Sequence, residues 1–180
     1  MSFGIESSLL VLLKAEGGYS NNPNDAGGET NHGITRKVAK ANGYAGAMKD
    51  LPLSKALDIY RQQYWFTPGF DKVAKVSPSI AGELFDTGVN MGPSVAIGFL
   101  IQVLNALNRQ QKDYEDVGFI QQAPVALAAF LNKRGQDEGE HVFLKALNCL
   151  QGARYIRLAE DKPQNEDFLY GWLSNRVSLG

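Results

Sequence analysis

The sequence predicts an all-α fold, and three observations lead to this prediction. Apolar residues recur at helical spacing through most of the 180-residue chain, and no convincing alternating strand pattern occurs. Gly, Pro and Asn separate the periodic segments, as they do at helix ends. The one long stretch without an apolar period is polar and Gly-rich. We therefore expect a mainly helical protein with one long polar loop, or a short hairpin, after the first helix.

The first helix is expected over residues 4–16. Leu9, Leu12 and Glu16 share a face of this helix, and two glycines follow it. Residues 17–35 are rich in the residues of turns and tight hairpins and have no apolar period. A loop this long without apolar anchors is uncommon unless it is functional or disordered, so it is the first place to look for chemistry.

Capping residues and helix breakers delimit the helices that follow. Thr35 is expected to cap a short helix that stops near Asn42, and Ser54 to cap a helix that runs to about Phe66. Ser77, followed by Pro78, is expected to open a helix that ends near Met91. Further helices are expected over residues 94–107, 123–133 and 138–160, with a last one that holds Phe168, Trp172 and Val177, and a polar loop over residues 108–118.

Composition and charge exclude several classes of function. Eighteen Lys and Arg oppose nineteen Asp and Glu, a net charge of −1, which gives no electrostatic argument for a nucleic-acid partner. The single Cys excludes an internal disulfide and a Cys-based zinc site, and two His are too few for a metal centre. We expect no metal and no cofactor.

The apolar runs predict neither a membrane span nor a signal peptide. The run Leu9–Leu13 is far shorter than the roughly 20 residues that cross a bilayer, and no basic region precedes it. We expect a chain made in the cytoplasm without a signal peptide and without membrane insertion. The short connections predict one compact body, whose function divides into residues 1–94 and 95–180.

Glu16 is the first candidate for catalysis. It lies at the end of the apolar stripe of the first helix, where partial desolvation disfavours the charged carboxylate and raises its pKa. A carboxyl with a raised pKa can act as a general acid near neutral pH. The competing interpretation is an ordinary surface Glu near a helix end.

Asp25 is the second candidate, in the middle of the polar loop. Its polar neighbours in the sequence favour the ionised form, so Glu16 and Asp25 form the acid and base pair that glycoside hydrolysis requires. Thr30 and Thr35 are placed to hold a water molecule between the two carboxyls. The competing interpretation makes Asp25 a turn residue before Gly27 and Gly28.

The segment that contains these candidates resembles the signature of glycoside hydrolase family 108. The likeness lies in Glu16-Gly17-Gly18-Tyr19, Asp25, Gly27-Gly28, Thr30 and Gly33-Ile34-Thr35. It continues downstream through an aromatic group and two motifs of the C-terminal half. These are Tyr60 with Tyr64-Trp65, residues 85–92 with Gln102, and Phe168 with residues 171–173 and 176–177. The resemblance covers nearly the whole chain.

The resemblance implies a lysozyme-like N-acetylmuramidase of phages, prophages or secretion systems. Such an enzyme cleaves the β-1,4 bond between N-acetylmuramic acid and N-acetylglucosamine in peptidoglycan. It implies that Glu16 protonates the glycosidic oxygen, that Asp25 is the base or electrostatic partner, and that Thr30 positions water. The enzyme would act on the cell wall, in the periplasm, after export by a holin or a secretion apparatus, or after lysis.

The resemblance also assigns residues to the binding groove. Tyr19, Thr35, Tyr60, Tyr64, Trp65, Asp86 and Asn90 are the expected substrate-binding residues. For the aromatic residues, core packing is the competing interpretation. Asp86 and Asn90 lie four residues apart on one helix face, where they either face the cleft or cap Gly92-Pro93.

Two other functions remain open at this stage. The first is a peptidoglycan-binding or secretion-accessory protein without turnover, based on the C-terminal half of the chain. The family's Asp-Gly turn in this half is interrupted around residues 116–123, so packing alone is an alternative role for it. The second is a lytic transglycosylase, which needs one carboxyl and leaves an anhydro sugar.

Overall fold

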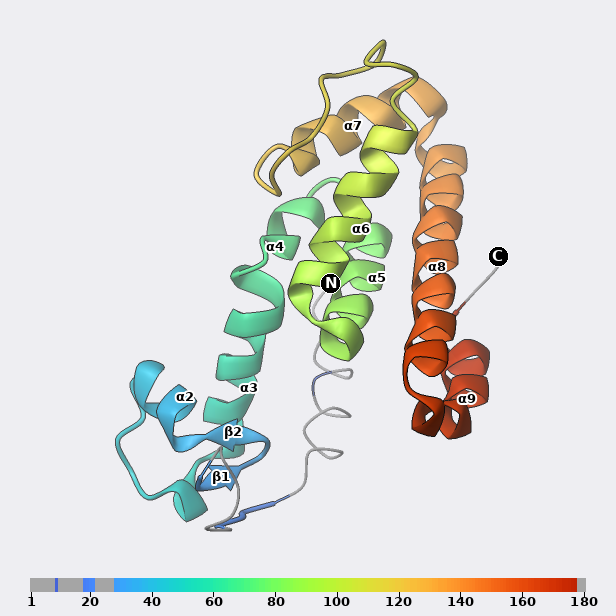
Figure 1. The fold of residues 1–180 in the computed structure, drawn as a ribbon. Helices are drawn as coiled ribbons and strands as arrows, with labels where there is room; N and C mark the ends of the chain where they lie inside the picture. Colours follow the sequence, from blue (N-terminus) through green and yellow to red (C-terminus); the bar gives the residue numbers. More distant parts are fainter. Residues whose placement is uncertain (1–8, 10–17, 22–27, 178–180) are drawn as a thin grey trace. The chain divides into compact units, whose positions relative to one another are not determined.

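The computed structural model describes Leu9, residues 18–21 and residues 28–177 of the chain (Figure 1). Helices make up most of these residues, and a single two-stranded sheet accompanies them in the part that the structure describes. The prediction of a mainly α fold with a short hairpin is therefore confirmed. The helix expected over residues 4–16 lies outside the described residues except for Leu9, which is helical and buried.

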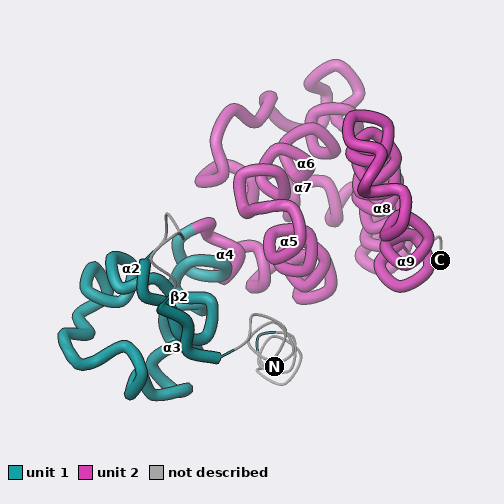
Figure 2. The backbone as a smooth tube through the Cα atoms, turned by 60° about the horizontal axis from the view of Figure 1, so that its bottom comes forward, with its two compact units in different colours: residues 1–67 teal, residues 68–180 magenta. Residues whose placement is uncertain are grey.

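The chain folds as two compact units, residues 1–67 and residues 68–180 (Figure 2). The first unit contains β1 (Thr30–Asn31), β2 (Ile34–Thr35), α2 (Arg36–Ala41), the 3-10 turn η1 (Met48–Asp50), α3 (Leu53–Arg61) and the π-helical turn η2 (Gln62–Phe66). The second contains α4 (Phe70–Val73), α5 (Pro78–Met91), α6 (Pro93–Ala106), α7 (Ala123–Arg134), α8 (Gln136–Asp161), the 3-10 turn η3 (Pro163–Asn165) and α9 (Glu166–Arg176). The division of function near residue 94 stays a prediction.

A tight hairpin forms the sheet of the first unit. Thr30 pairs with Thr35 and Asn31 with Ile34 in antiparallel register. The two turn residues, His32 and Gly33, have φ values of 52° and 72°. Positive φ at both central positions is typical of the turns whose twist matches that of a two-residue hairpin.

Hydrogen bonds from outside the hairpin hold it in place. The buried Asn31 amide donates from Nδ2 to the carbonyl oxygen of Met48 over 2.8 Å, and to that of Lys49 over 3.4 Å. On the other side, the Tyr60 hydroxyl donates to the carbonyl oxygen of His32 over 3.1 Å. Strands of two residues cannot stabilise themselves, so the hairpin depends on these contacts with η1 and α3.

The helix caps of the first unit follow the prediction at one position and differ at another. Thr35 Oγ1 accepts a hydrogen bond from the Val38 amide over 3.2 Å and caps α2, which ends before Asn42 as expected. The prediction that Ser54 caps the next helix is wrong. Pro52 occupies the cap position, since its fixed φ of −65° leads into α3 without a side-chain cap, and Ser54 lies inside the helix.

The helix that was expected to run to Phe66 changes geometry on the way. After Arg61, the backbone widens into the π-helical turn η2, and the Thr67 amide donates to the Gln62 carbonyl oxygen over 2.8 Å. Such wide turns are rare in proteins and are frequent at functional sites.

The expected helix boundaries of the second unit are confirmed to within a few residues. Ser77 Oγ accepts from the Ile80 amide over 3.1 Å, and Pro78 occupies the first helical position of α5. Gly92, with a φ of 93°, separates α5 from α6, and these two helices pack against each other. Their facing side chains, with those of α4, α7 and α8, form a buried apolar core that includes Phe70, Leu84, Leu100, Leu127 and Phe143.

A buried polar seam lies between α5 and α8. Gln151 Nε2 donates to Thr87 Oγ1 over 3.1 Å, and both side chains are buried. Glu83 Oε1, Gln151 Oε1 and the Tyr155 hydroxyl are buried and have no hydrogen-bond partner among the described residues. Such groups are costly in an apolar interior.

Burial changes the acidity of the carboxyl in this seam. Desolvation raises the pKa of Glu83 to about 7, the negative charge of Asp86 adds to this rise, and a hydrogen bond with Asn148 opposes it. Glu83 therefore carries its proton well above the pH at which an exposed Glu loses it.

Replacing Asn31 by Ala tests the anchor of the hairpin. The Met48 carbonyl would be left without its donor, so we expect the free energy of unfolding to fall by about 1–3 kcal/mol. Urea denaturation measures this loss. Asn175→Ala, which removes an exposed amide that bonds to the Gly171 carbonyl, is the matched control and should change little. Equal effects of the two substitutions would show that the Asn31 contact does not anchor the hairpin.

Glu83→Gln tests the polar seam through the pH dependence of stability. The folded protein holds the Glu83 proton to about pH 7, whereas the unfolded chain releases it near pH 4.5. Wild-type stability should therefore fall as the pH rises from about 4.5 to about 7. The Gln variant lacks this loss, so we expect it to exceed the wild type by about 1–3 kcal/mol at pH 8 and to match it at pH 4.

The control for this measurement is Glu160→Gln, at an exposed position of the same helix α8. Urea denaturation at pH 4, 6 and 8 should show no pH-dependent gain for the control. A Glu83→Gln variant whose advantage is the same at all three pH values would contradict a raised pKa.

Candidate functional site

The hairpin of the first unit carries the described part of the predicted catalytic segment. Thr30 and Thr35 form its outer pair, and Ser20 exchanges two backbone hydrogen bonds of 2.9 Å with Thr30. The segment 18–21 thus runs beside β1. Glu16 and Asp25 lie outside the described residues, so their catalytic roles stay predictions.

The two threonines of the hairpin have different surroundings. Thr30 is half-buried at the start of β1, between Ser20 and Thr35. The Thr35 side-chain oxygen accepts the amide hydrogen bond at the start of α2. Capping therefore accounts for Thr35 without a substrate, whereas the role of Thr30 in orienting water stays a prediction.

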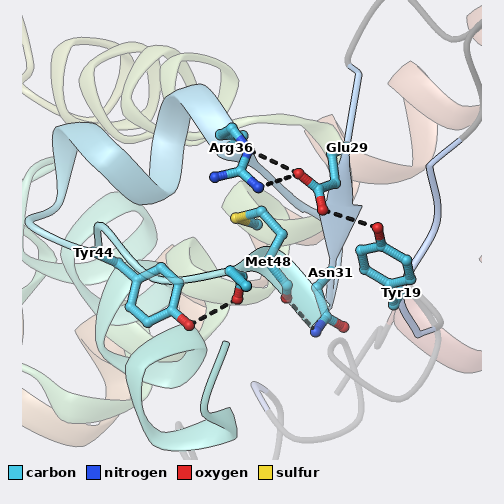
Figure 3. A network of polar contacts seen from close by, with 7 residues as sticks. Tyr19, Glu29, Asn31, Arg36, Tyr44 and Met48 are labelled. Carbon is cyan, nitrogen blue, oxygen red and sulfur yellow. Dashed lines mark hydrogen bonds and ion pairs between the residues drawn. The ribbon is translucent and has the colours of Figure 1, made fainter. Parts of the chain in front are cut away.

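A network of three side chains crosses the outer face of the hairpin (Figure 3). The Tyr19 hydroxyl donates to Glu29 Oε1 over 2.9 Å. Arg36 donates from Nε to Glu29 Oε2 over 2.7 Å, and its Nη2 contacts the same oxygen. The Arg36 amide also donates to the Glu29 carbonyl oxygen over 3.0 Å, so the pair is joined through both side chain and backbone.

This network fixes the protonation of its members. The hydrogen bonds from Arg36 and then from Tyr19 lower the pKa of Glu29, which stays an ionised carboxylate. The hydrogen bond to Glu29 raises the pKa of Tyr19, which keeps its phenolic proton. Glu29 thus places a negative charge, and Tyr19 an aromatic ring, within the described part of the predicted catalytic segment.

Sequence reasoning missed Glu29 and Arg36. The available signal was an acidic and a basic residue that flank the six-residue segment 30–35, which contains a turn signal at His32-Gly33. In a two-residue hairpin the residues that flank the strands lie opposite each other, so this pair could have been predicted.

The predicted aromatic group of the first unit lies on α3, which carries Tyr60, and on η2, which carries Tyr64 and Trp65. Tyr60 is buried, and its ring stacks on that of Tyr64 with centroids 5.7 Å apart and planes 12° apart. Its hydroxyl binds the hairpin turn, so Tyr60 positions the hairpin from inside the unit. Tyr64 and Trp65 lie half-buried on the π-helical turn.

Asp86 and Asn90 lie in the second unit, on α5. Asn90 Nδ2 donates to the Asp86 carbonyl oxygen over 2.7 Å, and Arg176 of α9 donates to Asp86 Oδ1 over 3.0 Å. The Gly92 amide bonds to the Gly88 carbonyl oxygen instead. The contacts of Asp86 and Asn90 therefore lie along α5 and toward α9, and their role in substrate binding stays a prediction.

The described residues contain no group of three or more His, Cys, Asp or Glu side chains suited to a metal ion. Over the same residues, no helix is both long and apolar enough to cross a membrane. The described part of the site offers hydroxyl, phenol, carboxylate and guanidinium groups. Such groups hold a polar polymer and orient water for proton transfer.

Two models of known protein families match separate parts of the chain. Residues 9–92 match the model of glycosyl hydrolase 108, and residues 122–177 match the model of a predicted peptidoglycan domain. The first match spans Glu16, Asp25, the hairpin and the aromatic turn. Among curated proteins, no match is found.

A solved structure, that of SagA from Brucella abortus, has a similar fold. It is 24% identical to this chain, the alignment covers 94% of this chain and 87% of that one, and the TM-score is 0.54. The likeness supports the mainly α fold over nearly the whole length of the chain. Together the matches make this protein a glycoside hydrolase that acts on peptidoglycan. Residues 9–92 are thus of the glycosyl hydrolase 108 type, and residues 122–177 are of the predicted peptidoglycan domain type.

Proposed function

We propose that the protein is an N-acetylmuramidase that hydrolyses the β-1,4 bond between N-acetylmuramic acid and N-acetylglucosamine. Glu16 is the general acid in this proposal. The observation that carries it is the state of Glu29, the carboxyl nearest to Thr30 along the described chain. Arg36 and Tyr19 hold Glu29 ionised, so it has no proton to give to a glycosidic oxygen near neutral pH. We assign the acid to Glu16, which ends the predicted apolar stripe of the same segment.

The other roles follow from the same segment. Asp25 acts as the base or as the electrostatic partner of the developing positive charge, and Thr30 positions the water that attacks. The anchored hairpin supports this arrangement, because a water-positioning residue needs a backbone that does not shift between turnovers. In each cycle one glycosidic bond breaks and the leaving oxygen takes a proton from Glu16. The hydroxyl of one water molecule adds to the sugar, and the remaining proton of that water passes to a carboxylate of the site and restores the acid.

Aromatic and polar residues would form the binding groove. Tyr64 and Trp65 are half-buried rather than fully packed, which leaves part of each ring for contact with a sugar face. The ring of Tyr19 is held by its hydroxyl and remains partly exposed. We assign Asp86 and Asn90 to substrate binding on the resemblance alone, with residues 1–94 as the catalytic region.

A second function, peptidoglycan binding by the C-terminal half, is favoured by a specific observation. The predicted peptidoglycan domain match covers α7, α8 and α9 and leaves the hairpin outside it. Binding by residues 95–180 would keep the enzyme on its polymeric substrate between cleavages. The enzyme would reach the wall through a holin, a secretion apparatus or lysis.

Glu16→Gln tests the proposed acid. Since general acid catalysis contributes about 10²–10⁴-fold, we expect release of reducing ends from purified sacculi to fall by about that factor. Glu115→Gln, in the exposed loop before α7, is the matched control and should retain wild-type activity. Circular dichroism checks that both variants are folded. A folded Glu16→Gln variant that cleaves as fast as the wild type would remove Glu16 from the mechanism.

Asp25→Asn separates hydrolysis from transglycosylation. A hydrolase that uses Asp25 should lose at least about tenfold in rate, and mass spectrometry should show reducing ends that carry one oxygen from ¹⁸O-labelled water. A lytic transglycosylase would keep most of its activity in the Asn variant. Its products would be anhydro sugars without the label, and that result would contradict the proposed reaction.

A further inference from the structure

A small pocket opens in the second unit at the corner between α7 and α8. It has a volume of about 240 Å³ and is lined by Leu107, Phe130, Arg134, Glu138, Gly139 and Val142. Neither the catalytic proposal nor the sequence motifs use it. Five of its six lining residues lie within the match to the predicted peptidoglycan domain.

Two glycines shape this corner. Gly135 has a φ of 88°, which lets the chain turn sharply from α7 into α8. A Cβ atom at Gly139 would lie 3.2 Å from Arg134 Cβ and 3.2 Å from Leu131 Cδ2. The absence of a side chain at Gly139 therefore brings the first turn of α8 close against the end of α7.

The pocket combines an apolar lining with two opposite charges. Phe130, Leu107 and Val142 supply the apolar surface, whereas Arg134 and Glu138 are exposed charged residues at the helix corner. Among the described residues, neither of these two forms an ion pair. Asp113, whose pKa is lowered first by Arg109 and further by Arg134, is already engaged with the Arg109 guanidinium. One cation and one anion thus remain for a ligand.

A strained but well-held loop follows Leu107. Arg109, Gln110 and Gln111 adopt φ values of 50°, 57° and 62°, a left-handed conformation that costs energy for residues other than Gly. The buried Asn108 holds the loop, since its Nδ2 donates to the Tyr114 carbonyl oxygen over 2.7 Å and its Oδ1 accepts from the Tyr114 amide over 3.1 Å. Consecutive strained residues persist only where the surroundings fix them, and they cluster at ligand sites.

We propose that this pocket binds the free end of a peptidoglycan stem peptide. A small apolar side chain of the peptide packs on Phe130, Leu107 and Val142. Arg134 binds a carboxylate of the peptide, and Glu138 binds an ammonium group. The inference rests on the proposed function in taking peptidoglycan as the ligand, and it adds which component of the wall the C-terminal half recognises.

Charge favours a peptide over a glycan in this pocket. A neutral sugar would cover Arg134 and Glu138 without neutralising either charge, which costs free energy. The volume of about 240 Å³ lies below the roughly 300–1,000 Å³ of pockets that enclose larger ligands, so the pocket takes in one end of a ligand.

Calorimetric titration with a synthetic stem tetrapeptide tests the proposal on the full chain. The probe is L-Ala-γ-D-Glu-meso-diaminopimelyl-D-Ala with free ends. We expect Arg134→Ala and Glu138→Ala each to raise the Kd at least about tenfold. Lys133→Ala and Asp137→Ala are matched controls, because each removes the same charge one residue earlier, outside the pocket lining. Val142→Trp, which fills the pocket and leaves both charges in place, should also abolish binding.

The outcomes separate this inference from the proposed function. Glu16→Gln should bind the tetrapeptide as the wild type does, so a protein that binds the peptide without hydrolysing sacculi would refute the muramidase proposal alone. A wild type that binds chitotetraose but not the tetrapeptide would overturn the peptide site. Equal losses in the Arg134 and Lys133 variants, or in the Glu138 and Asp137 variants, would overturn it as well.

Discussion

The buried amide of Asn31 is the contact on which the described part of the site depends. The hairpin has only two residues in each strand, so its own ladder cannot hold it against solvent. Asn31 joins it to η1, and Tyr60 joins its turn to α3. Thr30 and the network of Tyr19, Glu29 and Arg36 are therefore positioned by the contacts that Asn31 and Tyr60 make. Catalytic segments are often loops held by a rigid scaffold in this way.

Two glutamates show how the fold sets opposite protonation states with simple means. Glu29 lies beside a guanidinium and accepts a phenolic hydrogen bond, so its pKa falls. Glu83 lies in the seam between α5 and α8, where burial raises its pKa to about 7. The first therefore stays an anion beside the hairpin, whereas the second keeps its proton to a much higher pH. The proposed reaction requires the same kind of difference between Glu16, which must keep its proton, and Asp25, which must stay ionised.

The sequence predicted those features that local chemistry decides. Thr35 and the pair Ser77 and Pro78 are capping signals that act over one helical turn, and both were read correctly. Ser54 failed because a neighbouring proline can start a helix without any side-chain cap. The hairpin was foreseen only as one option, since its strands are too short to show alternation.

Features that join distant segments could not be predicted from spacing. The seam between Thr87 and Gln151 links residues 64 positions apart, and each residue alone looks like an ordinary polar position on a helix. The corner pocket forms only when α6, α7 and α8 pack together. The sequence alone therefore does not indicate that Arg134 and Glu138 line the same pocket. The pairing of Glu29 with Arg36 could have been predicted, because both residues lie within eight positions of the chain.

We propose that Glu16, in the segment before the hairpin, donates the proton to the glycosidic oxygen while the hairpin faces the sugar. A crystal structure of the inactive Glu16→Gln chain with a bound peptidoglycan tetrasaccharide tests this proposal. We expect the scissile oxygen within about 3 Å of the residue 16 side chain, with Asp25 and Thr30 beside the attacked carbon. A tetrasaccharide whose scissile bond lies out of reach of both residue 16 and the hairpin would contradict it.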